Sequence, residues 1–111
     1  MTASMMFVPA SAPDKYRKAL ATEAAALIVD LEDSVAPGAK AAARASLPAL
    51  LAGPRDKPVW VRVNDLSSGM LLDDLVSAVP ARPFGIVVPK CCGRESLLPV
   101  ARQWKLDLVK V

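Results

Sequence analysis

Four short apolar segments recur along the chain, and each one ends in polar or turn-forming residues. They are rich in Val, Ile or aromatic residues, which is the pattern of buried β-strands. Two of them are apolar almost to their ends, as expected for strands of a parallel sheet that is covered on both faces. The pattern predicts four strands, at residues 5–10, 25–32, 58–64 and 84–90.

Segments with apolar residues at helical spacing follow each predicted strand, at residues 11–24, 36–53, 68–79 and 94–104. Ser11 with Asp14 matches a Ser-x-x-acid capping pattern for the first of these helices, and Ser67 or Ser68 is expected to cap the third. Pro48 is expected to kink or end the second helix. The third helix is expected to bury one apolar face, formed by Leu71, Leu72, Leu75, Val76 and Val79.

Strict alternation of strand and helix predicts an α/β fold with a parallel sheet and right-handed crossovers. The sheet could be open and doubly wound, or it could be part of a (β/α)₈ barrel. A complete barrel needs ~250 residues, so the 111 residues here supply about half of one. The first strand is not followed by a Gly-rich phosphate loop, which disfavours the open nucleotide-binding fold. Residues 104–111 could begin a fifth strand.

Composition restricts the classes of function. The chain is 53% hydrophobic and 23% charged, which argues against disorder, and its 111 residues indicate one small domain or part of a larger one. The net charge of +3 is spread along the sequence without interleaved aromatic residues, so nucleic-acid binding is not expected. No apolar segment approaches the ~20 residues that cross a bilayer, and the N-terminus does not resemble a signal peptide. Neither a membrane location nor a nucleic-acid partner is expected.

The absence of His and the placement of the two Cys residues restrict the chemistry further. Without His, the chain has no Ser-His-Asp triad and no His-ligated metal. Any metal would be bound by oxygen ligands, which favours Mg²⁺ or a similar hard cation. Cys91 and Cys92 are adjacent, so they form neither a disulfide framework nor a zinc site. We expect a cytoplasmic protein, with both Cys residues buried as small apolar side chains.

Polar residues follow the predicted strands where each one ends. In parallel α/β folds the functional site is built at the carboxyl ends of the strands, so these side chains are expected to meet at one edge of the sheet. They are Ser11 after the first strand, Asp30, Glu32 and Asp33 at the second, Arg62, Asn64 and Asp65 at the third, and Lys90 at the fourth.

Each of these residues also has a purely structural interpretation. Asp33 or Ser34 could cap the next helix. Asp30 lies inside a strand and could form an ion pair with Arg62 or Lys90. Arg62 could be an ordinary exposed residue of a half-solvated strand, although its planar guanidinium suits bidentate binding of a carboxylate. Lys90 could be a plain strand-end lysine.

Several of these segments together resemble a known family. The segments "FVPASAPDKYRKAL", "LIVDLEDSVAPGAKAAAR", "PVWVRVND" and "GIVVPK" are similar, in order and spacing, to the N-terminal half of the HpcH/HpaI aldolase and citrate lyase β-subunit family. The resemblance covers about residues 5–98. It implies a (β/α)₈ barrel that makes or breaks C–C bonds in acyl-CoA thioesters such as citryl-CoA or malyl-CoA, with Mg²⁺ or a similar ion.

The resemblance also implies roles for individual residues. Arg62 would bind the keto-acid or carboxylate part of the substrate as the catalytic residue, together with Asp30, Glu32, Asp33 and Lys90. Glu32 and Asp33 would lie near the metal and its waters. The carboxylates that ligate the metal in the family follow strands five and six, which would lie beyond residue 111.

Residues 1–111 are therefore expected to form the N-terminal half of a barrel that is inactive alone and self-associates or forms homo-oligomers. Two alternatives remain, namely a non-catalytic fragment that acts only by association and a thioester hydrolase on the same scaffold.

Overall fold

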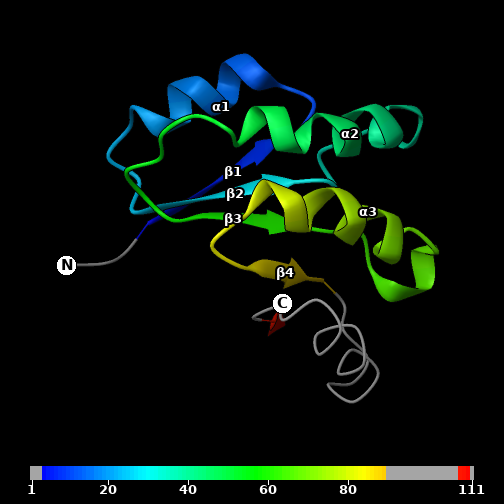
Figure 1. Cartoon of the computed structure of the whole chain (residues 1–111). Coiled ribbons are helices and arrows are strands. Elements are labelled where there is room, and N and C mark those ends of the chain that lie inside the picture. The colour runs from blue at the N-terminus through cyan, green and yellow to red at the C-terminus, as the bar shows by residue number, and fades with distance from the viewer. Residues whose placement is uncertain (1–3, 90–107, 111) are drawn as a thin grey trace.

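The computed structural model describes residues 4–89 and 108–110, which form a layer of helices against a parallel sheet (Figure 1). The strands are β1 (Met5–Pro9), β2 (Ala26–Asp30), β3 (Val59–Arg62), β4 (Ile86–Val88) and β5 (Leu108–Lys110). The helices are α1 (Pro13–Leu20), α2 (Lys40–Leu50) and α3 (Leu71–Ala78). Short 3-10 turns are present at Pro37–Ala39, Leu66–Ser68 and Val79–Ala81.

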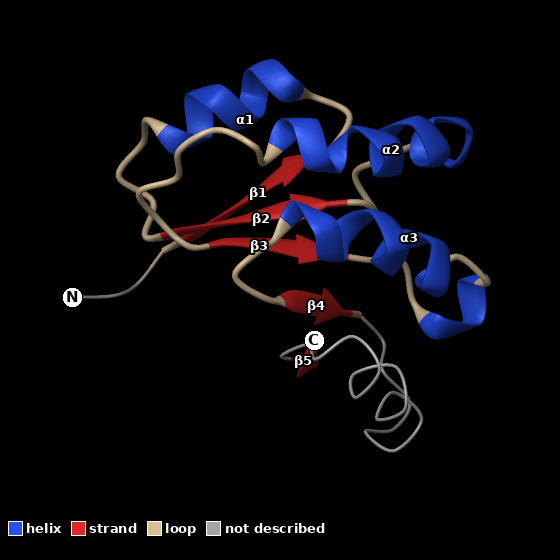
Figure 2. Ribbon diagram, viewed as in Figure 1, coloured by secondary structure: helices blue, strands red, loops and turns tan. Residues whose placement is uncertain are grey.

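The order of the strands distinguishes a barrel from an open doubly wound sheet. The strands lie in the order β1-β2-β3-β4-β5, and every neighbouring pair is parallel. A doubly wound sheet reverses its strand order and carries helices on both faces. Here α1, α2 and α3 lie on the same side of the sheet (Figure 2). The described part of the chain is therefore a partial (β/α)₈ barrel, as the sequence predicted.

The hydrophobic core lies between this helical layer and one face of the sheet. Alternate residues of β3 and the segment after it, Val59, Val61 and Val63, are at most 1% exposed and belong to the core. The residues between them, Trp60 and Arg62, point to the opposite face because side chains alternate along a strand. The other strands contribute Val8, Leu27, Val29, Ile86 and Val88 to the same core, and Leu31 joins it directly after β2.

The opposite face of the sheet, called the open face below, would be the interior of a closed barrel. The Trp60 ring packs directly against Gly85 on this face. A Cβ atom at position 85 would lie 2.2 Å from Trp60 Cζ3, so there is no room for a side chain there. The Trp60 ring also contacts Phe84, with ring centroids 5.0 Å apart. Met5, Phe7 and Phe84 are 50%, 49% and 61% exposed. Large apolar side chains are thus left in contact with solvent on the face that none of the described helices covers.

The predicted helix caps are wrong. The first helix begins at Pro13 with Ala12 as its N-cap and without a side-chain cap. Ser11 lies in a turn in which the Ala12 N–H donates to the Pro9 carbonyl, so it precedes the capping position. Ser67 and Ser68 lie in a 3-10 turn, and the third helix starts only at Leu71, after Met70 as its N-cap.

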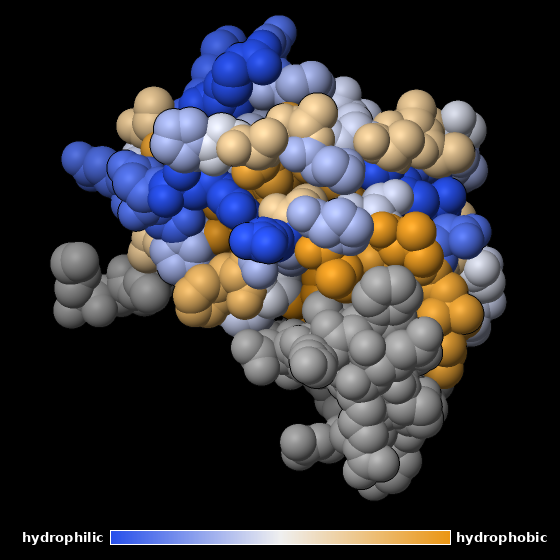
Figure 3. All heavy atoms as spheres, viewed as in Figure 1, coloured by the Kyte–Doolittle hydropathy of each residue, from blue (hydrophilic) through white to orange (hydrophobic). Residues whose placement is uncertain are grey.

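Pro48 lies inside α2, and the helix ends two residues later, at Leu50. The apolar face expected for the third helix needs correction. In α3, Leu71 and Leu75 are buried, but Leu72 is 59% and Val76 is 55% exposed. Apolar atoms accordingly gather on the surface over α3 (Figure 3). The buried stripe of this helix is narrower than predicted.

Some expectations concern residues outside the described ranges. These are Lys90, Cys91, Cys92 and the helix predicted at 94–104. The fifth strand that residues 104–111 could begin is present as β5. Within residues 4–89 and 108–110, no helix has the length and apolar character to cross a membrane.

The outer edge of β1 has no strand paired to it among the described residues. The Ala10 N–H donates to the Asp30 carbonyl of β2 at 2.9 Å. Because alternate residues of a parallel strand face alternate neighbours, Met5 and Phe7 direct their N–H and C=O groups away from β2. An edge of this kind, apolar and without charged side chains, favours pairing with another strand.

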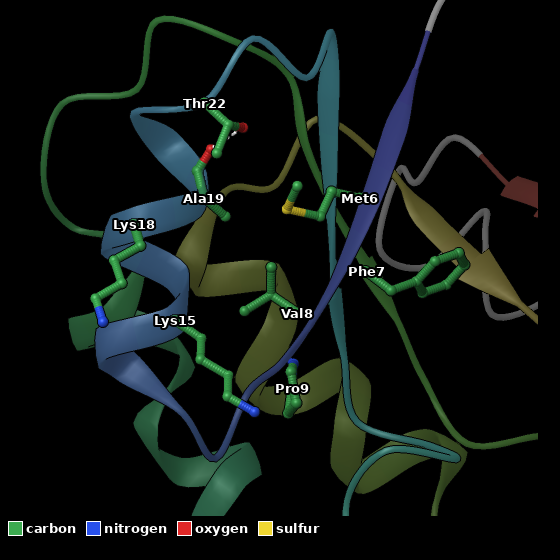
Figure 4. Close-up of a pocket in the computed structure, with 8 residues that line it drawn as sticks. All are labelled: Met6, Phe7, Val8, Pro9, Lys15, Lys18, Ala19 and Thr22. Carbon is green, nitrogen blue, oxygen red and sulfur yellow. Dashed lines mark hydrogen bonds between the residues drawn. The ribbon is translucent and has the colours of Figure 1, made fainter.

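A hollow of about 270 Å³ lies beside this edge, between β1 and α1. Met6 and Val8 extend from β1 toward α1, whereas Phe7 extends to the other side of the strand (Figure 4). The hollow is apolar apart from two lysines and one threonine. It is lined by Met6, Phe7, Val8, Pro9, Lys15, Lys18, Ala19 and Thr22.

We expect the 111-residue chain to self-associate at micromolar concentration, because the β1 edge and the open face leave apolar surface and unpaired backbone groups in solvent. Met6→Lys should weaken the association, since a lysine at a strand edge blocks strand addition. Leu72→Lys on α3 is the matched control. Sedimentation velocity measures both. A monodisperse parent monomer, or dissociation by Leu72→Lys alone, would contradict association through β1.

Candidate functional site at the strand ends

Two charged side chains meet at the carboxyl ends of β2 and β3, on the open face of the sheet. Asp30 and Arg62 are opposite each other in the register of the two strands. Arg62 Nε donates to Asp30 Oδ1 at 2.8 Å, and Arg62 Nη2 donates to Asp30 Oδ2 at 3.0 Å. The structural ion pair that was one alternative for Asp30 is therefore present, and it is bidentate.

Asp30 also organises the backbone that follows β2. Its Oδ1 accepts the Glu32 N–H at 2.9 Å, and its Oδ2 accepts the Ser34 N–H at 2.9 Å and the Ser34 hydroxyl at 2.7 Å. A short acidic side chain that binds N–H groups two and four residues later is a typical turn former. Asp30 is fully buried. The carboxylate thus joins β3 to the turn at residues 31–34.

These contacts set the charge state of Asp30. Burial by itself raises the pKa of its carboxyl group, because it disfavours the ionised form. The hydrogen bonds from Arg62, from the Ser34 hydroxyl and N–H, and from the Glu32 N–H outweigh burial and lower the pKa to about 2. Asp30 is therefore ionised at neutral pH. Its carboxylate in turn raises the pKa of Arg62, so the two form a fixed ion pair.

The guanidinium of Arg62 has donors beyond those that Asp30 uses. It carries five N–H groups in a planar fork, and Asp30 takes one edge of that fork through Nε and Nη2. The other edge, formed by Nη1 and Nη2, has the same geometry for a second carboxylate. The guanidinium carbon lies 4.6 Å from the centre of the Phe7 ring, and Glu32 Oε1 lies 3.6 Å from Arg62 Nε. Asp30 and Phe7 therefore hold the guanidinium in one orientation.

A second polar network lies on the helical side of the same strand ends. Asp74 of α3 is 1% exposed. Its Oδ2 accepts the backbone N–H and the side-chain amide of Asn64, both at 2.7 Å, and its Oδ1 accepts Arg44 Nε at 2.9 Å. Lys40 Nζ donates to Asn64 Oδ1 at 2.8 Å. This network connects α2 and α3 to the segments that follow β2 and β3.

The structure separates the remaining acidic residues that were expected at the site. Glu32 is 7% exposed and faces Arg62, whereas Asp33 is exposed. Neither Asp33 nor Ser34 caps the following turn, whose N-cap is Ala36 without a side-chain hydrogen bond. Ser34 instead binds Asp30. Lys90 lies outside the described residues.

The described residues do not provide a magnesium site by themselves. No group of three or more acidic, His or Cys side chains that could bind a metal ion is present among them. The Asp30 carboxylate is directed at Arg62 and the turn, and Asp33 points to solvent. Mg²⁺ needs octahedral oxygen coordination, which these separated carboxylates do not offer.

Comparison with known proteins places these features in a family. The sequence matches the HpcH/HpaI aldolase/citrate lyase family over residues 3–105. The chain belongs to this family. A citrate lyase subunit beta-like protein of Deinococcus radiodurans is 36% identical over 94 residues, which are 78% of this chain and 32% of that protein. The chain therefore spans about a third of the length of this curated relative.

Several solved structures share the fold of this chain. CitE of Mycobacterium tuberculosis, in complex with magnesium, acetoacetate and coenzyme A, has a TM-score of 0.82 and 27% identity, with 97% of this chain and 38% of that chain covered. The citrate lyase beta subunit of the same organism, complexed with oxaloacetate and magnesium, has a TM-score of 0.81 and 29% identity, covering 96% and 45%. RipC of Yersinia pestis has a TM-score of 0.70 and 25% identity, covering 99% and 46%.

Sequence analysis of this family member missed Lys40, Arg44 and Asp74. Charged residues on helices are usually exposed to solvent. The residues around Lys40 and Arg44 in the sequence do not indicate that these two side chains are partly buried. Asp74 did carry one, since it lies at helical spacing from the buried residues Leu71 and Ala78. A carboxylate on the apolar stripe of a helix must find hydrogen-bond donors when that stripe packs.

Proposed function

We propose that this chain is the N-terminal part of a Mg²⁺-dependent C–C lyase that cleaves an acyl-CoA thioester of the citryl-CoA or malyl-CoA type. The products are a keto acid and a shorter acyl-CoA. The observation that carries the proposal is the Asp30–Arg62 pair, which sits on the open face at the strand ends and leaves one edge of the guanidinium for a second carboxylate. Similarity to structures that contain magnesium with acetoacetate or oxaloacetate supports it.

In this proposal Arg62 binds the carboxylate of the keto-acid portion through its Nη1 and Nη2 groups. Asp30 binds the other edge of the guanidinium and orients it before the substrate binds. The Arg62 side chain therefore loses little conformational entropy on binding. Glu32, close to the same guanidinium, is on the substrate side of the turn. Asp33 and Lys90 are proposed contributors to the same substrate site, since both follow strand ends in the sequence.

The magnesium ion of the proposed reaction does not fit the described residues, as shown above, so its ligands are proposed to come from elsewhere in the complete barrel. When bound, such an ion stabilises negative charge on a substrate oxygen. The residues described here would contribute the binding and orientation of the carboxylate.

We expect the 111-residue chain alone to bind Mg²⁺ only in the millimolar range, because few oxygen ligands are available, and to show no measurable cleavage of citryl-CoA or malyl-CoA. Titration calorimetry measures the first quantity, and an assay for released keto acid measures the second. Micromolar Mg²⁺ affinity, or turnover above a metal-free control, would contradict this expectation.

The proposed function is tested in a chimera that joins residues 1–89 of this chain to the matching C-terminal part of the Mycobacterium tuberculosis citrate lyase beta subunit. Arg62→Lys should lower kcat/KM for the CoA thioester by ~100-fold, because lysine cannot make a bidentate contact. Arg17→Lys, on the exposed face of α1, is the matched control.

Kinetics of the Arg62→Lys chimera within a few-fold of the parent would show that Arg62 does not bind the substrate carboxylate. The products separate the two chemistries that the scaffold could support. Equal amounts of keto acid and shorter acyl-CoA indicate C–C cleavage. Free CoA with an intact carboxylic acid would instead indicate thioester hydrolysis.

A further inference from the structure

Lys40, the first residue of α2, makes contacts that the proposed reaction does not explain. Its Nζ donates to the backbone carbonyl of Leu31 at 3.0 Å, to the carbonyl of Glu32 at 2.6 Å and to Asn64 Oδ1 at 2.8 Å. A lysine ammonium has three donors and no acceptor. All three donors are therefore used, and two of them bind the turn that carries Glu32 and Asp33.

The two carbonyls belong to successive residues, and this restricts the backbone. In an extended strand, successive carbonyls point in opposite directions. Here the carbonyls of Leu31 and Glu32 converge on one nitrogen atom. The ammonium therefore stabilises the bend with which the chain leaves β2. The Asn64 amide adds a second donor to the Leu31 carbonyl, at 3.1 Å.

The same turn is bound from its other side by a negative charge. Its N–H groups, at Glu32 and Ser34, donate to the Asp30 carboxylate, while its carbonyls accept from the Lys40 ammonium. Hydrogen bonds to charged groups are stronger than those between neutral groups. Residues 31–34 are thus fixed between a buried anion and a partly buried cation.

The ammonium is itself held in place. Asn64, which accepts from Lys40, is 3% exposed and is bound through its amide and its N–H by Asp74. Asp74 is in turn bound by Arg44. A flexible lysine side chain is therefore fixed at its far end by Asn64, which Asp74 of α3 holds in place.

We propose that Lys40 is a positioning residue, a permanent internal cation that fixes the backbone of residues 31–34 and so directs Glu32 toward Arg62. What Glu32 then does rests on the proposed function, but the positioning does not. Because the cation is part of the chain, the order of this turn is independent of Mg²⁺. A turn organised by a bound metal ion would lose its order when the metal is chelated.

The test follows amide hydrogen exchange by NMR in the ¹⁵N-labelled 111-residue chain. Lys40→Met, which keeps the length of the side chain but removes the charge, should speed exchange of the Glu32 and Ser34 amides at least tenfold. The Val61 and Val63 amides of the neighbouring strand should change less than twofold. Lys15→Met, on the exposed face of α1, is the matched control and should change none of them.

A conservative variant separates positioning from simple packing. Lys40→Arg retains a charged donor and should recover most of the protection of the two turn amides, whereas loss of packing alone would not be recovered by a larger side chain. Protection in the parent should not change on addition of EDTA. Unchanged exchange in Lys40→Met, or loss of protection in the parent with EDTA, would overturn the proposal.

If Lys40→Met does not fold, the parent and Lys40→Arg still decide the question. A partly buried ammonium with all three donors hydrogen-bonded should give an Nζ–H signal at neutral pH that exchanges slowly with water and is missing from Lys40→Arg. No such signal in the parent would overturn the proposal. The kinetics of the Arg62→Lys chimera report separately on the proposed function, since unchanged kinetics there would contradict that function while the exchange data still measured the positioning.

Discussion

Replacing Asp30 with Asn is expected to lower the free energy of unfolding by about 3–5 kcal/mol, because removing one partner of a buried ion pair leaves an uncompensated charge. Arg62, only 16% exposed, would lose both contacts of its bidentate pair. The Glu32 and Ser34 N–H groups would lose the charge of their acceptor. Urea denaturation measures the change, since the slope and midpoint together give the free energy of unfolding.

Asp33→Asn is the matched control, three residues away and exposed; surface changes of this kind usually stay within about 0.5 kcal/mol. A double variant, Asp30→Leu with Arg62→Leu, should recover much of the loss, because a buried pair can often be replaced by apolar residues of similar volume. A loss below about 1 kcal/mol for Asp30→Asn would contradict the buried bidentate pair.

The same substitution should alter the acid dependence of stability. The pKa of Asp30 is lowered from 3.8 to about 2 in the folded chain. The stabilisation is therefore complete above about pH 4 and is lost as the pH falls toward 2, by about 2 kcal/mol from the relation of about 1.4 kcal/mol per pKa unit. The Asn variant should lack this part of the acid dependence.

Replacing Asp74 with Ala should have an effect of similar size, about 3–5 kcal/mol. The carboxylate binds Arg44 and both donors of Asn64, and all of these groups would be left without it in a buried site. An unpaired buried polar group costs about 1–3 kcal/mol by itself. Thermal and urea denaturation of the purified chain measure the loss.

Asp73→Ala is a close control for this prediction, because Asp73 is the preceding residue of the same helix and is exposed. Both substitutions change helix propensity equally, so the difference between them isolates the buried contacts. Equal stability of the two variants would show that the Asp74 network contributes little.

Much of the fold could be predicted from the local sequence. The apolar segments with turn-forming ends correctly indicated β1, β2, β3 and β4, and the alternation with helices indicated a parallel sheet. These features follow from burial of side chains at a period of two or 3.6 residues, which the sequence displays directly. The helix caps failed because a turn after Pro9 and a 3-10 turn before Leu71 displaced the helix starts. Such displacements depend on backbone hydrogen bonds, which cannot be predicted from the type of any single residue.

The site was only partly predictable, for a reason that Asp30 and Arg62 illustrate. The sequence showed a carboxylate and a guanidinium at the ends of two apolar strands and left open whether Arg62 bound a ligand or Asp30. The register of β2 and β3 decided that the two side chains are opposite each other. Register depends on how the two whole strands pair, so it cannot be predicted from the sequence of either strand alone. The pair then leaves one edge of the fork for a ligand, so the two alternatives are compatible.

The sequence by itself determined that this chain forms parallel strands with polar residues at their carboxyl ends, because burial and side-chain alternation act locally along each segment. The tertiary structure alone decided which of those polar residues meet. It brought Lys40 from a helix to the carbonyls of Leu31 and Glu32 and placed Asp74 behind Asn64. A charged side chain on a helix forms buried hydrogen bonds only when packing excludes water from it. That packing depends on all the helices and strands together.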